Sequence, residues 1–162
     1  MGKMKVLVIS DSHSNISNLK HVMGFAKKIK AKAVIHCGDW NNPISVDAVT
    51  NFNIPLYSVI GNADISAEIR RNLILKSEGF SEDFLKFELD GVKIGITHKP
   101  SDIRKYFDVS ELDVVFCGHL HSKDESSING VKVIRPGALE TTVNFAVYDT
   151  ETNTIEFISH ND

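Results

Sequence analysis

Hydrophobic residues in the first half of the chain follow two alternating patterns. Continuous runs of aliphatic residues at 4–10, 33–38 and 55–61 are typical of strands that are buried on both faces. Within 15–29 the apolar residues recur at helical spacing, and 45–52 predicts a shorter helix. Strands separated by helices indicate right-handed crossovers and a mainly parallel sheet.

The second half of the chain favours paired strands. An Asp-Gly pair lies at the centre of a predicted hairpin at 84–98, and an Asn-Gly pair lies at the centre of another at 126–137. Two more strands are expected within 144–159, around a polar loop. We therefore expect an α/β fold in which two sheets pack face to face as an α/β sandwich, with helices on the outer faces and residues 1–162 forming a single domain.

The composition and net charge of the chain limit which binding partners and which cellular compartment are expected. The 162 residues carry a net charge of −3, which gives no general attraction to nucleic acid or to an anionic membrane. No apolar run approaches membrane-spanning length, and residues 1–10 lack the features of a signal peptide. Cys37 and Cys117 each end an apolar run, so buried thiols are favoured over a disulfide. We expect a cytoplasmic protein.

Polar side chains gather where the predicted strands end. The residues concerned are Asp11, His13, Asp39, Asn62, Asp64, His98, His119 and His121. In open α/β sheets, ligands bind outside the carboxyl ends of the strands, so five strand ends would bring these groups to one rim.

Each of these residues has an ordinary structural explanation when it is considered alone. An Asp after a strand is commonly a cap or turn residue. A single His there is more often a hydrogen-bonded structural residue, and we keep that interpretation for His21, His36 and His160. Four imidazoles and two carboxylates on one rim are different, because burying them together without a partner is costly. Bound metal ions would resolve this, and the two oxygens of Asp39 could bridge two of them.

The order of motifs, D-x-H, G-D, G-N, H and G-H-x-H, resembles the calcineurin-like metallophosphoesterase superfamily. The compact phosphodiesterase branch of archaea and bacteria, related to the small retromer subunit, is the most similar part of it. The resemblance implies a two-metal centre with Asp39 as the bridging ligand. One metal would be held by Asp11, His13, Asp39 and His121, and the other by Asp39, Asn62, His98 and His119.

This resemblance implies hydrolysis of a phosphodiester by a metal-bound hydroxide, with Asp39, Asn62 and His98 as catalytic residues. Ligation by imidazole and oxygen favours two divalent ions of manganese, iron, cobalt, nickel or zinc. The expected substrate is a small phosphate ester that could be nucleotide-like, and a phosphomonoester is the near alternative. A homodimer could cover an exposed strand edge.

The sequence departs from the family pattern after Asn62. Many active members have a histidine at the next position, where it is taken to protonate the leaving group, whereas this chain has Ala63. The neighbouring Asp64 could donate a proton through water or could simply cap a turn. A catalytically weak protein that serves as an interaction scaffold is therefore the alternative function.

Four further residues are candidates for substrate contact. Arg135 could bind a phosphate or could be a surface arginine, and Asn15 could bind substrate or cap the helix that follows it. Asn18 could also touch the substrate, and Lys99, directly after His98, is a weaker candidate for the same role.

Overall fold

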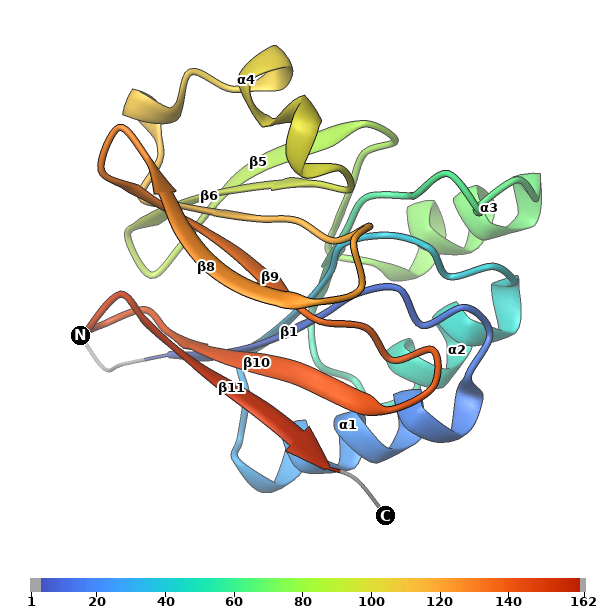
Figure 1. Ribbon diagram of the computed structural model, residues 1–162. Helices are drawn as coiled ribbons and strands as arrows, with labels where there is room; N and C mark the ends of the chain where they lie inside the picture. Colours follow the sequence, from blue (N-terminus) through green and yellow to red (C-terminus); the bar gives the residue numbers. More distant parts are fainter. Residues whose placement is uncertain (1–3, 161–162) are drawn as a thin grey trace.

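The computed structural model describes residues 4–160, and two mixed sheets form its centre (Figure 1). The first sheet has the strand order β11-β10-β1-β2-β3-β4, and the second has the order β5-β6-β7-β9-β8. The strands of the first sheet are β1 (Lys5–Ile9), β2 (Ala33–His36), β3 (Leu56–Ser58), β4 (Gly79–Phe80), β10 (Val143–Asp149) and β11 (Thr154–His160). Those of the second are β5 (Phe84–Leu89), β6 (Val92–Thr97), β7 (Val114–Phe116), β8 (Lys123–Ile128) and β9 (Val131–Pro136).

Side chains that alternate along β1 divide the interior into layers. Val6 and Val8 point towards the second sheet and pack with Ile96 and Phe116, whereas Leu7 points to the opposite face. That opposite face is covered by α1 (Ile16–Lys28), α2 (Pro43–Thr50) and α3 (Ala67–Lys76). The outer face of the second sheet is covered by η1 (Pro100–Asp102), α4 (Ile103–Tyr106) and η2 (Val109–Glu111). The expected sandwich with outer helices is confirmed.

The two predicted tight hairpins are present. Asp90 and Gly91 have φ values of 49° and 77° between β5 and β6, and Asn129 and Gly130 have values of 50° and 83° between β8 and β9. Positive φ at both central residues is the mark of a type I′ turn, whose twist matches that of the flanking strands.

Other details of the first sheet differ from the expectation. The β1–β2 and β2–β3 ladders are parallel as predicted, but β10 pairs with β1 in antiparallel fashion, β11 extends that edge, and β4 adds a further parallel pair with β3. The helix expected at 45–52 begins earlier, at Pro43, because the side chain of Asn42 caps it by accepting from Ser45 N–H. Helix α3 and the two-residue strand β4 were not predicted at all.

Edge strand β8 bears on the predicted homodimer. Its residues Lys123–Ser127 are exposed and include Lys123, Asp124 and Glu125, and charged residues on an edge discourage pairing with another strand. Edge strand β8 therefore gives no support for a homodimer, which stays a prediction.

Candidate metal centre

All seven predicted ligands lie just beyond the carboxyl ends of strands. Asp11 and His13 follow β1, Asp39 follows β2, Asn62 follows β3, His98 follows β6, and His119 and His121 follow β7. These strands belong to both sheets, so the residues meet where the rims of the two sheets come together.

Strained backbone directs five of the seven side chains. Positive φ values occur at Asp11 (52°), His13 (42°), Asp39 (68°), His119 (74°) and His121 (62°). Left-handed conformation in residues other than glycine costs on the order of 1–3 kcal/mol each and tends to concentrate at functional sites. The concentration of this backbone strain on one rim indicates that the fold tolerates it in order to place these side chains.

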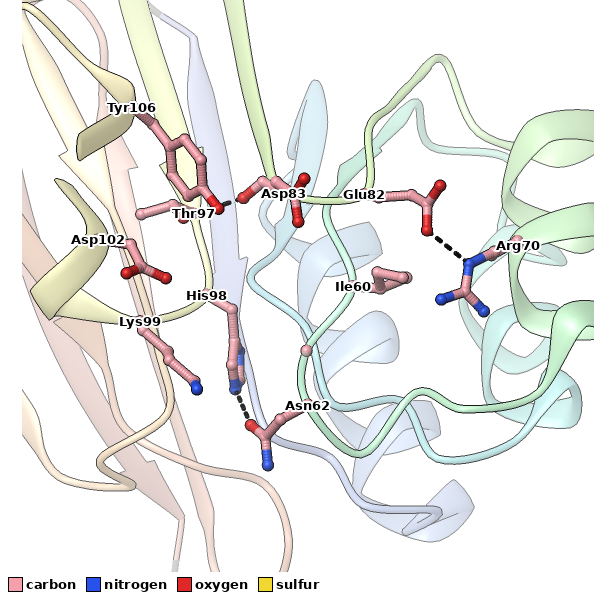
Figure 2. Close-up of a pocket in the computed structure, with 11 residues that line it drawn as sticks. Ile60, Asn62, Arg70, Glu82, Asp83, Thr97, His98, Lys99, Asp102 and Tyr106 are labelled. Atoms are coloured by element: carbon pink, nitrogen blue, oxygen red, sulfur yellow. Dashed lines mark hydrogen bonds and ion pairs between the residues drawn. The ribbon is translucent and has the colours of Figure 1, made fainter.

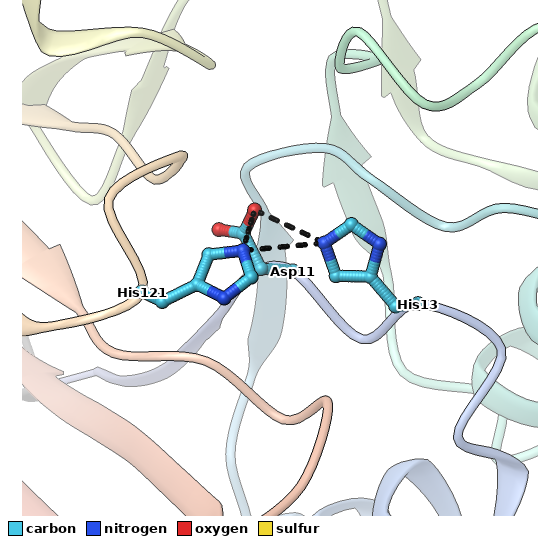
Figure 3. Close-up of side chains that lie close together, drawn as sticks. All are labelled: Asp11, His13 and His121. Carbon is cyan, nitrogen blue, oxygen red and sulfur yellow. Dashed lines mark hydrogen bonds and ion pairs between the residues drawn. The ribbon is translucent and has the colours of Figure 1, made fainter.

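Asp11, His13 and His121 form one group of converging donor atoms (Figure 3). His121 Nε2 lies 3.4 Å from Asp11 Oδ1 and 3.3 Å from His13 Nε2, and His13 Nε2 lies 3.7 Å from the same carboxylate oxygen. Asp11 Oδ1 is buried and, within residues 4–160, has no hydrogen-bond partner. A carboxylate oxygen left in this way between two imidazole nitrogens fits a bound cation.

A second group combines Asp11 with Asp39 and His98. His98 Nε2 is 3.2 Å from Asp39 Oδ2 and 3.0 Å from Asn62 Oδ1, and Asp39 Oδ2 is also 3.4 Å from His13 Nε2. Asp39 therefore contacts members of both groups, as a bridging ligand would, although Asp11 also belongs to both. The fourth imidazole, His119, lies against His98 with 5.2 Å between ring centroids.

Three of the imidazoles are oriented by acceptors at Nδ1. His98 Nδ1 is 2.8 Å from the carbonyl oxygen of Cys37, and His13 Nδ1 is 3.1 Å from Asn41 Oδ1. His121 Nδ1 is 3.4 Å from Glu140 Oε2. An acceptor at Nδ1 fixes the proton there and leaves the Nε2 lone pair free, which is the usual arrangement of a metal-binding histidine. Neither Asn41 nor Glu140 belongs to one of the ordered motifs, so these two contacts were not predicted from the sequence.

Burial and the neighbouring polar and charged groups shift the pKa values of the acidic side chains in opposite directions. Burial raises the pKa of Asp11 above its usual value. Burial also favours the neutral form of Asp39, but the close contact with His98 and the hydrogen bond from Ala63 N–H outweigh it and hold the pKa of Asp39 below its usual range. For His98, the nearby Asp39 outweighs burial and raises the imidazole pKa.

Asp64 links two of the loops that carry ligands. Its Oδ2 accepts from Asp39 N–H and Gly61 N–H, both at 2.9 Å, and its Oδ1 accepts from Asn41 N–H at 2.8 Å. Burial nevertheless raises its pKa. These contacts agree with the turn-capping alternative. Ala63 donates its backbone N–H to Asp39 Oδ1 at 2.9 Å.

Asn15 and Arg135, the two candidate substrate contacts, are engaged within the protein. Asn15 Oδ1 caps α1 by accepting from Asn18 N–H, and Asn15 Nδ2 donates to the carbonyl oxygen of Glu140 at 2.8 Å. Arg135 Nε donates to the carbonyl oxygen of Ser122 at 2.6 Å. For Asn15 this favours the capping alternative; contact of either residue with substrate stays a prediction.

The remaining histidines and the two cysteine thiols belong to neither group of converging donors found among residues 4–160. His36 is buried, stacks on Trp40 at 3.7 Å and contacts Ser12 Oγ at 3.0 Å. Burial lowers its pKa to about 3. His21 and His160 contact each other through ring nitrogens 2.9 Å apart. Cys37 and Cys117 are free and buried, as expected. Within residues 4–160, no helix has the length and apolar character needed to cross a membrane.

Comparison with known proteins agrees with this arrangement. "Phosphodiesterase MJ0936" of Methanocaldococcus jannaschii is 28% identical over 138 residues, which cover 83% of each chain. The solved structure of an archaeal phosphodiesterase superposes with a TM-score of 0.85 at 25% identity, covering 97% of this chain and 100% of that one. Vacuolar protein sorting 29 of Cryptosporidium parvum shares the fold, with a TM-score of 0.65 at 17% identity and coverage of 98% and 97%. The model of the calcineurin-like phosphoesterase superfamily domain matches residues 4–153, and the chain belongs to this family.

Proposed function

We propose that the protein is a phosphodiesterase that hydrolyses a small phosphate ester with two divalent transition-metal ions. The observation that carries this proposal is that Asp11 Oδ1, at the meeting point of both donor groups, is buried and has no hydrogen-bond partner among residues 4–160. The curated archaeal relative with 28% identity is named a phosphodiesterase, which supports a diester as the substrate.

The proposed ligands divide between two ions. Asp11, His13, Asp39 and His121 would hold one, and Asp39, Asn62, His98 and His119 would hold the other. Two such ions supply a clamp for the phosphoryl group and a hydroxide nucleophile near neutral pH. Ions of manganese, nickel, iron, cobalt or zinc suit the mixed nitrogen and oxygen donors.

The protein's own groups determine how well these ions are held and what happens to the leaving group. Cys37, Asn41 and Glu140 orient three imidazoles, and Asp64 holds the loops of Asp39 and Asn62 together. Position 63 provides no proton, since its side chain is a methyl group. We therefore expect faster hydrolysis of diesters with good leaving groups than of alkyl diesters.

Hydrolysis of bis-p-nitrophenyl phosphate and of p-nitrophenyl phosphate, measured side by side, tests the proposal. Chelator-stripped protein is titrated with Mn²⁺, Ni²⁺ or Zn²⁺, and metal-dependent turnover of the diester is expected. Asp39→Asn should abolish it, because the near-isosteric amide removes a charge while retaining an acceptor for Ala63 N–H. The exposed Asp124 provides the control variant, Asp124→Asn, which should retain full activity. Turnover of the monoester alone would instead indicate a phosphatase.

Ala63 favours a second candidate, an interaction scaffold with little activity. The fold likeness to vacuolar protein sorting 29 is compatible with it. Binding of two metal ions without turnover of either ester would support this candidate over the hydrolase.

A further inference from the structure

A cavity of about 280 Å³ adjoins the candidate metal centre on the side of Asn62 and His98 (Figure 2). Four segments build it: the loop after β3, helix α3, the loop between β4 and β5, and the segment from the end of β6 into α4. It therefore opens between the two sheets, beyond the carboxyl ends of β3 and β6. Clefts in this position are common ligand sites in α/β folds, and the volume is near the lower limit for small-molecule pockets.

One wall of the cavity is fixed and electrically neutralised. Arg70 Nε donates to Glu82 Oε1 at 2.7 Å, so the guanidinium of α3 is already paired. On the floor, Thr97 Oγ1 donates to the carbonyl oxygen of Asp83 at 3.0 Å, which ties the start of β5 to the end of β6. The shape of the cavity is thus held by contacts that leave other lining groups free.

Three charged lining groups have no ion-pair partner among residues 4–160: Lys99, Asp83 and Asp102. Asp102 is at the N-cap position of α4, yet its carboxylate makes no capping hydrogen bond. Lys99 directs its amine towards the end of the cavity where His98 and Asn62 lie (Figure 2). A cation therefore lies beside the metal centre, and two free acceptors lie further along the wall.

We propose that this cavity holds the second ester substituent of the phosphodiester, and that this substituent is a small polyhydroxylated alcohol of the sugar class. The inference rests on the proposed function. Lys99 would contact the phosphoryl group as a cation, and Asp83 and Asp102 would accept hydrogen bonds from the hydroxyl groups of the substituent. A purely aliphatic substituent would displace water from the half-buried Asp102 and the exposed Asp83 without supplying a hydrogen-bond donor to either carboxylate.

Two monoesters of equal carbon number test this preference: ribose 5-phosphate and n-pentyl phosphate. Calorimetric titration into Mn²⁺-loaded protein reads binding without turnover. Ribose 5-phosphate should bind about tenfold more tightly, because its hydroxyl groups can donate to both carboxylates, although water competes for the exposed Asp83 and the half-buried Asp102. The double variant Asp83→Ala/Asp102→Ala should lose that preference. Lys99→Gln should weaken the binding of both monoesters by a similar factor and leave the preference for ribose 5-phosphate in place.

Asp124→Ala and Lys93→Gln are the matched controls, since both residues are exposed and neither lines the cavity. They should bind both monoesters like the unmodified protein. Equal affinity for the two monoesters, or a preference that survives the double variant, would overturn the inference. Diester turnover without a binding preference would overturn only the subsite, whereas a preference without any turnover would retain the subsite and overturn the proposed hydrolase.

Discussion

Position 63 has a methyl group directly after the candidate ligand Asn62, where the leaving group of a bound ester would need a proton. Ala63→His should raise the rate for an alkyl-leaving diester by about tenfold, below the 10²–10⁴-fold typical of an optimised general acid. The rate for bis-p-nitrophenyl phosphate should change little, because p-nitrophenolate leaves without a proton. Steady-state kinetics on both diesters measure this. Ala63→Leu controls for side-chain size, and an equal gain with leucine would contradict the explanation.

Glu140 is the residue whose role depends most on tertiary structure. Its carboxylate lies 3.4 Å from His121 Nδ1, and its backbone carbonyl is held by Asn15 Nδ2. Partners of this kind typically change metal affinity by 10–100-fold, and we expect Glu140→Gln to lower Mn²⁺ affinity by about tenfold, since both side chains are partly exposed. Calorimetric titration of Mn²⁺ into stripped protein measures this. The control is Glu151→Gln in the β10–β11 turn, and unchanged affinity in Glu140→Gln would show that the contact is incidental.

The contrast between His98 and Glu140 shows what sequence could indicate at this scale. His98 follows a recognisable strand and lies within an ordered series of motifs, so its position near the other candidate ligands could be expected. Glu140 belongs to the β9–β10 loop and reaches His121 only because that loop folds back against the start of α1. No local pattern encodes such a contact.

At the scale of elements, the strand-to-loop junctions depend on glycines that allow close approach. A Cβ at Gly118 would lie inside the van der Waals contact distance of Ser10 Oγ and 2.6 Å from Asp11 Oδ2. Gly118→Ala should therefore displace the Asp11 carboxylate, lower metal affinity by at least tenfold, and destabilise the fold by about 1–3 kcal/mol through overpacking. Calorimetry and urea unfolding measure the two effects.

Gly24 provides the matched control for that substitution. It lies within α1, and a Cβ there would have no heavy atom within 4 Å. Gly24→Ala should stabilise the protein by roughly 0.5–1 kcal/mol, since alanine loses less backbone entropy in a helix. Metal affinity should not change. A Gly118→Ala protein with normal metal affinity would show that the β7 end can shift without cost.

Helix α3 shows why some elements were not predictable. Only Ile69 and Leu73 are buried in it, while Ile74 and Leu75 are exposed, so its apolar residues do not form a single helical stripe. The hairpins were predictable for the opposite reason, because an Asp-Gly or Asn-Gly pair between alternating residues specifies a turn locally. The long antiparallel β1–β10 ladder joins residues far apart in the chain, and no local signal placed it.

At the scale of the whole molecule, the candidate metal ligands lie across the junction of the two sheets. Asp11, His13, Asp39 and Asn62 follow strands of the first sheet, and His98, His119 and His121 follow strands of the second. At their meeting point, the buried Asp11 Oδ1 has no hydrogen-bond partner in the described part of the chain, residues 4–160. Bound ions would therefore link the sheets at one rim, and their removal should affect global stability as well as activity.

Metal ions that bind only the folded state should raise the melting temperature in a concentration-dependent manner. At a free concentration 100 times Kd, the stabilisation is about 2.7 kcal/mol, which corresponds to roughly 5–10 °C for a chain of this size. Calorimetric scans of stripped protein, with and without Mn²⁺, measure the shift, and added chelator should reverse it. Asp39→Asn should lose most of the shift because it weakens both donor groups, whereas Asp124→Asn should keep it. If neither Mn²⁺ nor chelator changes the melting temperature, the converging side chains hold no ion, and the metal centre proposed between the sheets would have to be abandoned.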